Sequence, residues 1–251
     1  MSDNPFFDKY AEGYAKSVSH AKGADLDLLM SIIPDGLNNC LDVATGTGFT
    51  AAALSQKCRR VIAIDETENM INKARDLMKD RGIKNVEFIK TQFESYETDI
   101  KFDAITIRRA LHHFNDKSAF FNKASKLIAE NGTIAIADMV SPEDDDEDNF
   151  NMLERIRDPT HVGALKISEY RKLAELHGLK ILSMNTTIEE LTFEKWLYPV
   201  PKDSEAGKKC LSFLNGLTSD QLRRIRFDPE KMVLRKERLI IALTKADQPK
   251  I

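Results

Sequence analysis

The sequence predicts an α/β fold in which a mainly parallel sheet is covered by helices on both faces. From about residue 38 to residue 186, short apolar runs rich in β-branched residues alternate with longer helical patterns. Helical crossovers of that kind join parallel strands. A second observation is a turn with two glycines that follows the first apolar run and opens a helical pattern, as in folds that bind nucleotides.

Each expected strand is a short apolar segment bounded by polar residues or turns. We expect strands at residues 40–44, 60–65, 86–90, 102–107, 133–138, 179–186 and 238–245. The last of these is approached without a crossover helix, which is typical of an antiparallel partner.

The helices between these strands have recognisable ends. Thr67, Asp116 and Ser168 each precede an amphipathic pattern, so we expect all three as N-caps. Gly82 can supply the left-handed conformation that ends the first of these helices.

Two regions lie outside this alternation of strands and helices. Residues 1–36 are expected to form an N-terminal helical lid, and residues 189–236 a small helical cap inserted before the last strand. The second region is too long for a turn. The sheet domain then comprises residues 37–188 together with 237–251, and we expect the two outer regions to determine substrate specificity.

Composition limits the partners of the chain. Among 251 residues, 37 are basic and 40 acidic, and the net charge of −3 argues against nucleic acid as a partner. The three cysteines are widely spaced and show no ligand pattern, so no metal is expected. The first residues lack a secretory signal, and no segment approaches the about 18 uninterrupted apolar residues of a membrane span. We therefore expect a cytoplasmic protein.

The stretch LDVATGTGFTA at residues 41–51 is the best candidate for a ligand site. Gly46 allows the turn, Gly48 is expected to let the backbone approach a ligand, and Ala51 permits close helix packing. Asp65 ends the next strand about 20 residues later, where a carboxylate can accept both hydroxyls of a ribose. A nucleoside-like ligand is therefore expected between these two strands.

Two cofactor classes suit such a turn, a nicotinamide dinucleotide and S-adenosylmethionine. Asp42 favours the second, because an acid near the end of the first strand suits a site that receives a cationic amino acid. Gln92 and Phe93, after the third strand, are placed to meet an adenine edge and face. An NAD-dependent oxidoreductase stays open as an alternative, as does a non-catalytic module that binds S-adenosylmethionine.

The motifs together resemble the class I S-adenosylmethionine-dependent methyltransferases, in the branch similar to the ubiquinone and menaquinone biosynthesis methyltransferases (methyltransferase type 11 like). The matching segments lie at residues 41–51, 63–67, 86–94, 102–114, 131–138 and 157–181. The resemblance implies a Rossmann-like sheet of seven strands with the last one antiparallel. It also implies a cofactor at the carboxyl ends of the first four strands, and a lid from the N-terminal helices.

The resemblance implies a set of cofactor-binding residues. Asp65 and Glu66 are assigned to the ribose, and Met70 to packing near the adenine. The complete expected set is Asp42, Ala44, Gly46, Gly48, Asp65, Glu66, Met70, Gln92, Phe93 and Arg108. One departure from the family pattern concerns the adenine contact, where members commonly carry Asp and Ala in place of Gln92 and Phe93. The Gln92 amide can still accept a hydrogen bond through its carbonyl oxygen, without charge.

The acceptor side of the site is less defined by the sequence. His113 and His161 are the candidates for a catalytic base, with packing or structural roles as the alternative. The expected substrate-binding residues are Tyr10, Tyr14, Arg157 and Asp158. The predicted function is methyl transfer to a small-molecule acceptor, with an aromatic or quinone-like molecule and a homodimeric assembly as open possibilities.

Overall fold

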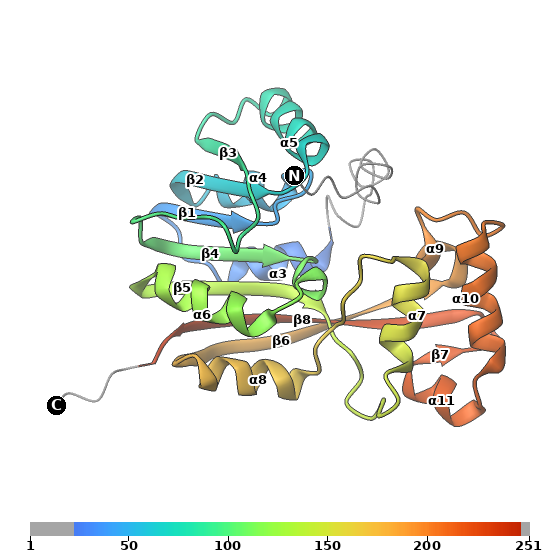
Figure 1. Cartoon of the computed structure of the whole chain (residues 1–251). Helices are drawn as coiled ribbons and strands as arrows, with labels where there is room; N and C mark the ends of the chain where they lie inside the picture. The colour runs from blue at the N-terminus through green and yellow to red at the C-terminus, as the bar shows by residue number, and fades with distance from the viewer. Residues whose placement is uncertain (1–22, 247–251) are drawn as a thin grey trace.

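The computed structural model of the chain describes residues 23–246, and one mixed sheet runs through them (Figure 1). The strand order is β3-β2-β1-β4-β5-β8-β6, and the short β7 pairs with β8 beside this path. The bounds are β1 (Leu37–Val43), β2 (Cys58–Asp65), β3 (Val86–Lys90), β4 (Phe102–Arg108), β5 (Ile128–Met139), β6 (Leu179–Thr192), β7 (Phe227–Asp228) and β8 (Val233–Lys245). Strands β1 to β5 pair in parallel, whereas β8 runs antiparallel to both β5 and β6. The expected α/β fold with an antiparallel last strand is confirmed.

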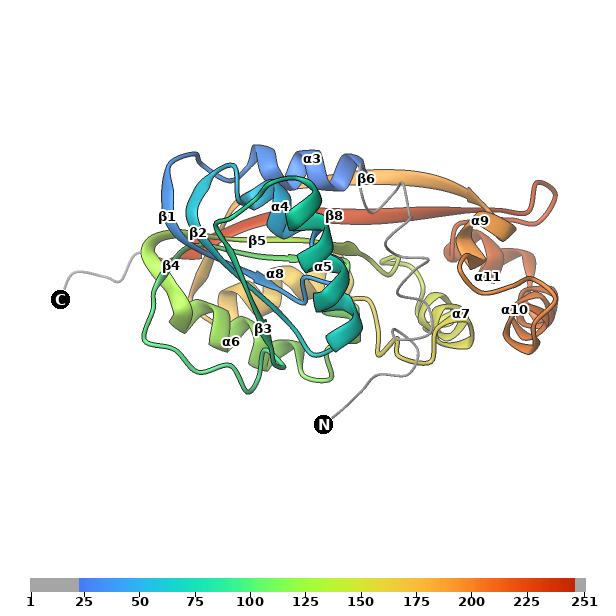
Figure 2. The ribbon, with the colours of Figure 1, turned by 90° about the horizontal axis from the view of Figure 1, so that it is seen from above.

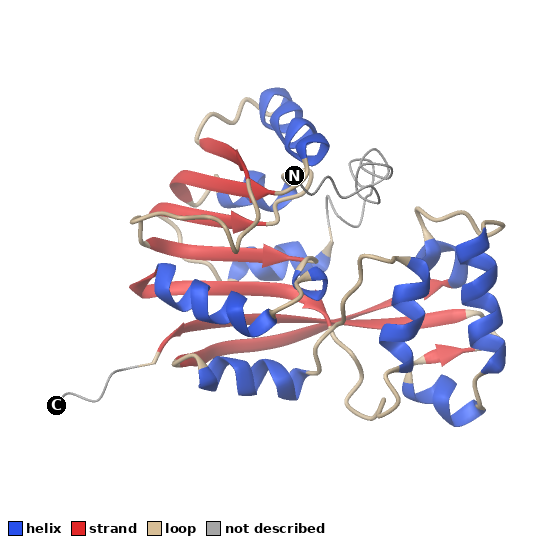
Figure 3. Ribbon diagram, viewed as in Figure 1, coloured by secondary structure: helices blue, strands red, loops and turns tan. Residues whose placement is uncertain are grey.

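Helices cover both faces of this sheet (Figures 2 and 3). One face packs against α3 (Ala24–Ser31), α4 (Phe49–Leu54) and α5 (Glu68–Asp80) through small sheet residues such as Ala63, Ala104 and Ala135. The other face packs against α6 (Lys117–Leu127) and α8 (Ile167–Leu176). Small side chains on the first face let its helices lie close to the strands.

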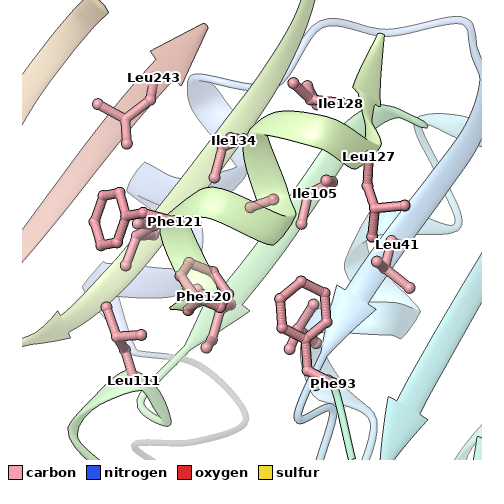
Figure 4. Close-up of a cluster of buried hydrophobic side chains, with 14 of the residues drawn as sticks. Leu41, Phe93, Ile105, Leu111, Phe120, Phe121, Leu127, Ile128, Ile134 and Leu243 are labelled. Atoms are coloured by element: carbon pink, nitrogen blue, oxygen red, sulfur yellow. The ribbon is translucent and has the colours of Figure 1, made fainter. Parts of the chain in front are cut away.

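The larger core cluster lies on the α6 and α8 face (Figure 4). Leu41 and Ile105 project from adjacent parallel strands, and Phe120 and Phe121 meet them from α6. Phe93, from the loop after β3, joins the cluster with its ring 5.2 Å from that of Phe120. Burying side chains of this size stabilises the fold by roughly 1.5–3 kcal/mol each. The loop after β3 is thereby anchored to the core.

The helix ends show where local sequence signals decide the structure. The Asp116 side chain accepts a hydrogen bond from Ala119 N at 2.8 Å and caps α6 as expected. Gly82 follows α5 with φ of +65°. The prediction for Ser168 is wrong, because α8 begins at Ile167 and the Ser168 amide donates to the Glu143 carboxylate at 2.7 Å. That carboxylate comes from a preceding loop, so the sequence near Ser168 does not contain the signal.

A second lobe lies at the right of Figure 1, beyond the part of the sheet that α3 to α6 and α8 cover. It contains the far ends of β6 and β8, α9 (Phe193–Leu197), α10 (Glu205–Gly216), α11 (Ser219–Arg224) and α7 (Asn149–Arg157), which share one apolar cluster. Residues 189–192 and 233–236, expected in the helical cap, instead extend the two strands. The strands pair with each other along the whole ribbon into this lobe, from Leu179↔Lys245 to Thr192↔Val233. The contribution of α7 was not predicted.

The region expected to form an N-terminal lid is described only in part. Within 23–36, α3 packs against the sheet through Leu29, whereas Tyr10 and Tyr14 lie outside the described residues. Within residues 23–246, none of the helices has the length and apolar character that crossing a membrane requires.

Candidate active site

A cleft of about 750 Å³ opens at the carboxyl ends of β1, β2, β3 and β4. Its walls come from the turns that follow these strands, from the segment around His113, and from the loop between α7 and α8. The expected residues that line it are Ala44, Gly46, Asp65, Glu66, Met70, Gln92, Phe93, Arg108 and His113. The cleft therefore brings together residues from four strand ends, from η1 and from the loop between α7 and α8.

The glycine turn is held in place by backbone geometry. Ala44, Gly46 and Gly48 have φ of 51°, 55° and 85°, the left-handed region that favours glycine. A Cβ on Gly48 would lie 2.8 Å from Ala74 Cβ of α5. Gly48 does not line the cleft, so its small size serves helix packing. The expectation that it lets the backbone approach a ligand is not supported by its position.

Asp42 lies behind this turn rather than in the cleft. Its side chain is 1% exposed and accepts hydrogen bonds from Thr45 Oγ1 at 2.6 Å and Thr106 Oγ1 at 2.7 Å. Burial raises the pKa of Asp42 to about 6, although the two hydroxyl donors oppose that shift. Asp42 thus joins the turn to β4, and a direct contact with a cofactor, expected from the sequence, is not supported by its position.

Asp65 connects the glycine turn to the start of α5. Its carboxylate accepts hydrogen bonds from Gly46 N at 2.8 Å and Thr67 N at 2.9 Å. Burial raises the pKa of Asp65 to about 6, and the two backbone donors partly offset that effect. Beside it, Glu66 Oε2 accepts from Gln92 Nε2 at 2.7 Å, so the acceptor atom of the Gln92 amide is its Oε1.

Two arginines at the end of β4 share one buried carboxylate from α3. Arg108 Nε and Arg109 Nε donate to Asp25 Oδ2 at 2.8 and 2.7 Å, and a second nitrogen of each donates to Oδ1. Burial acts to raise the pKa of Asp25, but the two guanidinium groups outweigh it and hold that pKa well below its usual range. Arg109 has φ of 54° and also lines the cleft. The sequence did not identify Asp25 or Arg109, because the pairing spans more than 80 residues.

A short 3-10 helix, η1 (Leu111–His113), carries two histidines with different surroundings. His112 is buried, and its Nδ1 lies 2.7 Å from Asp138 Oδ1. His113 lines the cleft, and its Nδ1 lies 3.0 Å from the carbonyl oxygen of Thr160. Burial, followed by the neighbouring charge of His112, lowers the pKa of His113 to about 4. The ring of His113 is therefore neutral at pH 7.

His161 is placed away from the cleft. It is 4% exposed, and its Nε2 lies 2.8 Å from Asn151 Oδ1. Burial lowers the pKa of His161 to about 2. A role as a base acting on the acceptor is not supported by this position.

Arg157 and Asp158 also lie outside the cleft lining. Arg157 pairs with the buried Glu154 at 3.3 Å and donates to the carbonyl oxygen of Trp196 at 3.3 Å. Asp158 is 2% exposed and accepts from Thr160 N and Oγ1. Direct contact of either residue with a substrate is not supported, whereas Pro159, Thr160 and Val162 of the same loop do line the cleft.

The second lobe contains a buried ionic cluster centred on Glu154. Glu154 accepts from Lys236 Nζ at 2.6 Å and from Trp196 Nε1 at 2.9 Å, in addition to the pairing with Arg157. Burial lowers the pKa of Lys236 to about 8, and Glu154 opposes that shift. This cluster links α7, which leads into the Thr160 loop, to β8 and α9.

Comparison with known proteins identifies the family. The family described as a methyltransferase domain matches residues 35–192. The chain belongs to this methyltransferase family. The uncharacterised methyltransferase YcgJ of Bacillus subtilis is 29% identical to this methyltransferase over 226 residues, which are 89% of each chain.

Solved structures agree with that assignment. A putative methyltransferase from Bacillus halodurans superposes with a TM-score of 0.82 at 28% identity, covering 90% of this chain and 100% of the other.

A further relative is similar in sequence over about half of the chain. The ubiquinone/menaquinone biosynthesis C-methyltransferase UbiE of Pseudomonas putida is 26% identical over 147 residues, which are 50% of this chain and 57% of its own length. The expected class of S-adenosylmethionine-dependent methyltransferases is confirmed.

Proposed function

We propose that this methyltransferase binds S-adenosylmethionine in the cleft and transfers the methyl group to a small-molecule acceptor held against His113. The observation that carries the proposal is the cleft itself, which joins the glycine turn, the Asp65 and Glu66 carboxylates and the acceptor wall around His113. Its volume of about 750 Å³ falls within the range of about 300–1,000 Å³ typical of small-molecule sites.

The half of the cleft beside the ends of β1, β2 and β3 fits an adenosyl cofactor chemically. Asp65 and Glu66 provide carboxylate oxygens for ribose hydroxyls, and Met70 and Phe93 provide apolar contacts for an adenine ring. Gln92 provides its amide oxygen for the adenine amino group. Ala44, Gly46 and Arg108 line the part proposed for the amino-acid end.

The other half of the cleft, formed by η1 and the loop between α7 and α8, offers apolar surface to an acceptor. Phe114, Pro159 and Val162 contribute apolar surface, and His113 contributes a neutral imidazole. S-adenosylmethionine, when bound, supplies an electrophilic methyl group on a sulfonium sulfur, so the protein needs chiefly to align the acceptor. A neutral imidazole can also accept a proton from an acceptor that must lose one. Partial similarity to UbiE supports an aromatic or quinone-like acceptor as the first class to test.

A transfer assay tests this function. Purified protein is incubated with S-adenosylmethionine labelled in its methyl group and a small-molecule extract. Label should move into the extract with wild-type protein, and much less with His113→Gln. Wild-type protein that binds the cofactor but moves no label into the extract would contradict catalysis and support a non-catalytic binding module.

A further inference from the structure

The loop between α7 and α8 contacts His113 through both oxygens of one residue. The Thr160 carbonyl oxygen lies 3.0 Å from His113 Nδ1, and Thr160 Oγ1 lies 3.1 Å from the same nitrogen. These residues are 47 positions apart in the chain. Both line the cleft, so the contact is part of its acceptor wall.

The direction of these hydrogen bonds determines which nitrogen of His113 carries the proton. A carbonyl oxygen can only accept, so Nδ1 must be the donor to Thr160 O. The Thr160 hydroxyl donates its own hydrogen to Asp158 Oδ1 at 2.6 Å, and it therefore also accepts from Nδ1. A neutral imidazole has one N–H, so the second nitrogen, Nε2, is the acceptor.

Asp158 and the backbone hold Thr160 in this position. Asp158 Oδ1 also accepts from Thr160 N at 2.9 Å, which closes a tight turn around Pro159. The amides of Val162 and Gly163 both donate to the His112 carbonyl oxygen at 3.0 Å. The loop is thus attached to η1 at Thr160 and at the two amides that follow it.

Burial is the main cause that keeps the His113 ring neutral near pH 7, and the charged groups around it act in both directions. Burial lowers the pKa of His113 most, and His112, with its ring centroid 4.1 Å away, lowers it further. The carboxylates of Asp158 and Asp138 act in the opposite direction, and His161 lies behind His112 at 5.3 Å between ring centroids. Nε2 therefore retains its lone pair at physiological pH.

We propose that Thr160 and Asp158 are positioning residues that hold His113 as the Nδ1–H tautomer, so that Nε2 accepts the proton of a hydroxyl group on the methyl acceptor. This inference rests on the proposed function and narrows its substrate class to acceptors with a hydroxyl proton to lose. An acceptor without such a proton, such as a thioether or a tertiary amine, makes no use of this arrangement.

The proposed step balances without a further reactant. The acceptor oxygen forms the new O–C bond, and the bond from the methyl carbon to the sulfonium sulfur breaks with its electron pair on sulfur, giving a thioether. The hydroxyl proton moves to Nε2 of His113, and the resulting imidazolium later releases it to water. Thr160 O and Oγ1 continue to accept from Nδ1 in both protonation states.

Nitrogen-15 NMR of the histidine side chains in the cofactor-free protein tests the positioning at pH 7. His113→Gln assigns the signals, and the wild-type spectrum should show a protonated Nδ1 and an unprotonated Nε2. Thr160→Val should raise the ratio of the Nε2–H to the Nδ1–H form about fivefold, the scale of one lost hydrogen bond, whereas Thr160→Ser should restore the wild-type ratio. Asp158→Asn should lower the pKa of His113, because it removes a nearby negative charge.

Two substitutions outside the loop and η1 serve as controls. Thr187→Val, on β6, and Asp76→Asn, on the exposed side of α5, should leave the His113 signals unchanged. A wild-type spectrum with a protonated Nε2, or a folded Thr160→Val protein with the wild-type ratio, would overturn the proposal. The wild-type spectrum alone decides the tautomer if Thr160→Val does not fold.

A pair of probes tests the substrate class. Phenol should shift the Nε2 signal of His113 on titration, and anisole, which lacks the hydroxyl proton, should leave it in place. Equal responses to both probes, or no response to phenol, would overturn the hydroxyl assignment. These measurements need no cofactor, so failure of S-adenosylhomocysteine to bind would reject the proposed function and leave the tautomer result standing.

Discussion

The two halves of the cleft are constructed differently. The half beside β1 and β2 is held by contacts between residues that are close in sequence. The Asp65 carboxylate accepts hydrogen bonds from the amides of Gly46 and Thr67, all within about one strand–helix unit. The half proposed for the acceptor depends on the contact of Thr160 with His113, which joins the loop after α7 to η1, the short helix that follows β4. The difference teaches that the half proposed for the cofactor depends on the core sheet, whereas the half proposed for the acceptor also depends on the loop that follows α7.

The largest expected effect comes from disrupting the ionic cluster inside the second lobe, on which the Thr160 loop after α7 depends. Glu154→Ala leaves the buried Lys236 and the half-buried Arg157 without their shared carboxylate, which should lower the free energy of unfolding by about 3–5 kcal/mol. Trp196, the single tryptophan of the chain, donates to Glu154 and reports on this lobe. Urea unfolding followed by its fluorescence should show the loss. Glu190→Ala, which breaks an exposed pair with Arg235, serves as the control, and an unchanged midpoint in Glu154→Ala would contradict the role of the cluster.

A second substitution acts on the packing behind the glycine turn. Gly48→Ala should lower the free energy of unfolding by about 2–4 kcal/mol, because positive φ and overpacking against Ala74 add together. Gly36→Ala also has positive φ but meets no atom within 4 Å, so it should cost about 1–2 kcal/mol. Denaturant titration compares the two. Equal losses would show that contact with α5 does not constrain this position.

The sequence predicted which residues meet at the β1 and β2 end of the cleft, because the signals for them are local. Gly46 and Asp65 lie within about 20 residues of each other, as family motifs of this kind do, and both line the cleft. The Asp116 cap was predictable for the same reason. By contrast, Asp42 was assigned to a ligand because the sequence shows the residue but not its partner, Thr106, 64 positions away.

The acceptor half could not be predicted from local patterns. His161 and Thr160 are adjacent in sequence, and only the fold shows that one is buried against Asn151 while the other faces His113. The apolar cluster of the second lobe likewise forms because α7, which ends at Arg157, packs with helices that begin only at Phe193. Such long-range pairing carries no periodicity that a sequence reveals.

The buried Asp42 provides a pH test of the cofactor half. Its pKa is raised by burial to about 6 from the usual 3.8, so the folded state binds more protons than the unfolded state between these values. The contribution of Asp42 to stability is therefore present at low pH and declines as pH rises from about 4 to 6. Asp42→Asn removes this dependence, and its free energy of unfolding relative to wild type should improve by up to about 3 kcal/mol between pH 4 and 7. A constant difference across this range, measured by urea unfolding, would exclude the raised pKa.

The most direct test of the central claim is calorimetric titration with S-adenosylhomocysteine. Wild-type protein should bind this nucleoside and not NADH, and Asp65→Ala should weaken the binding by about 1.5–3 kcal/mol, since it removes hydrogen bonds to a charged group and releases the Gly46 amide. Asp76→Asn should bind like wild type. An unchanged dissociation constant in Asp65→Ala, or binding of NADH in place of S-adenosylhomocysteine, would contradict the account.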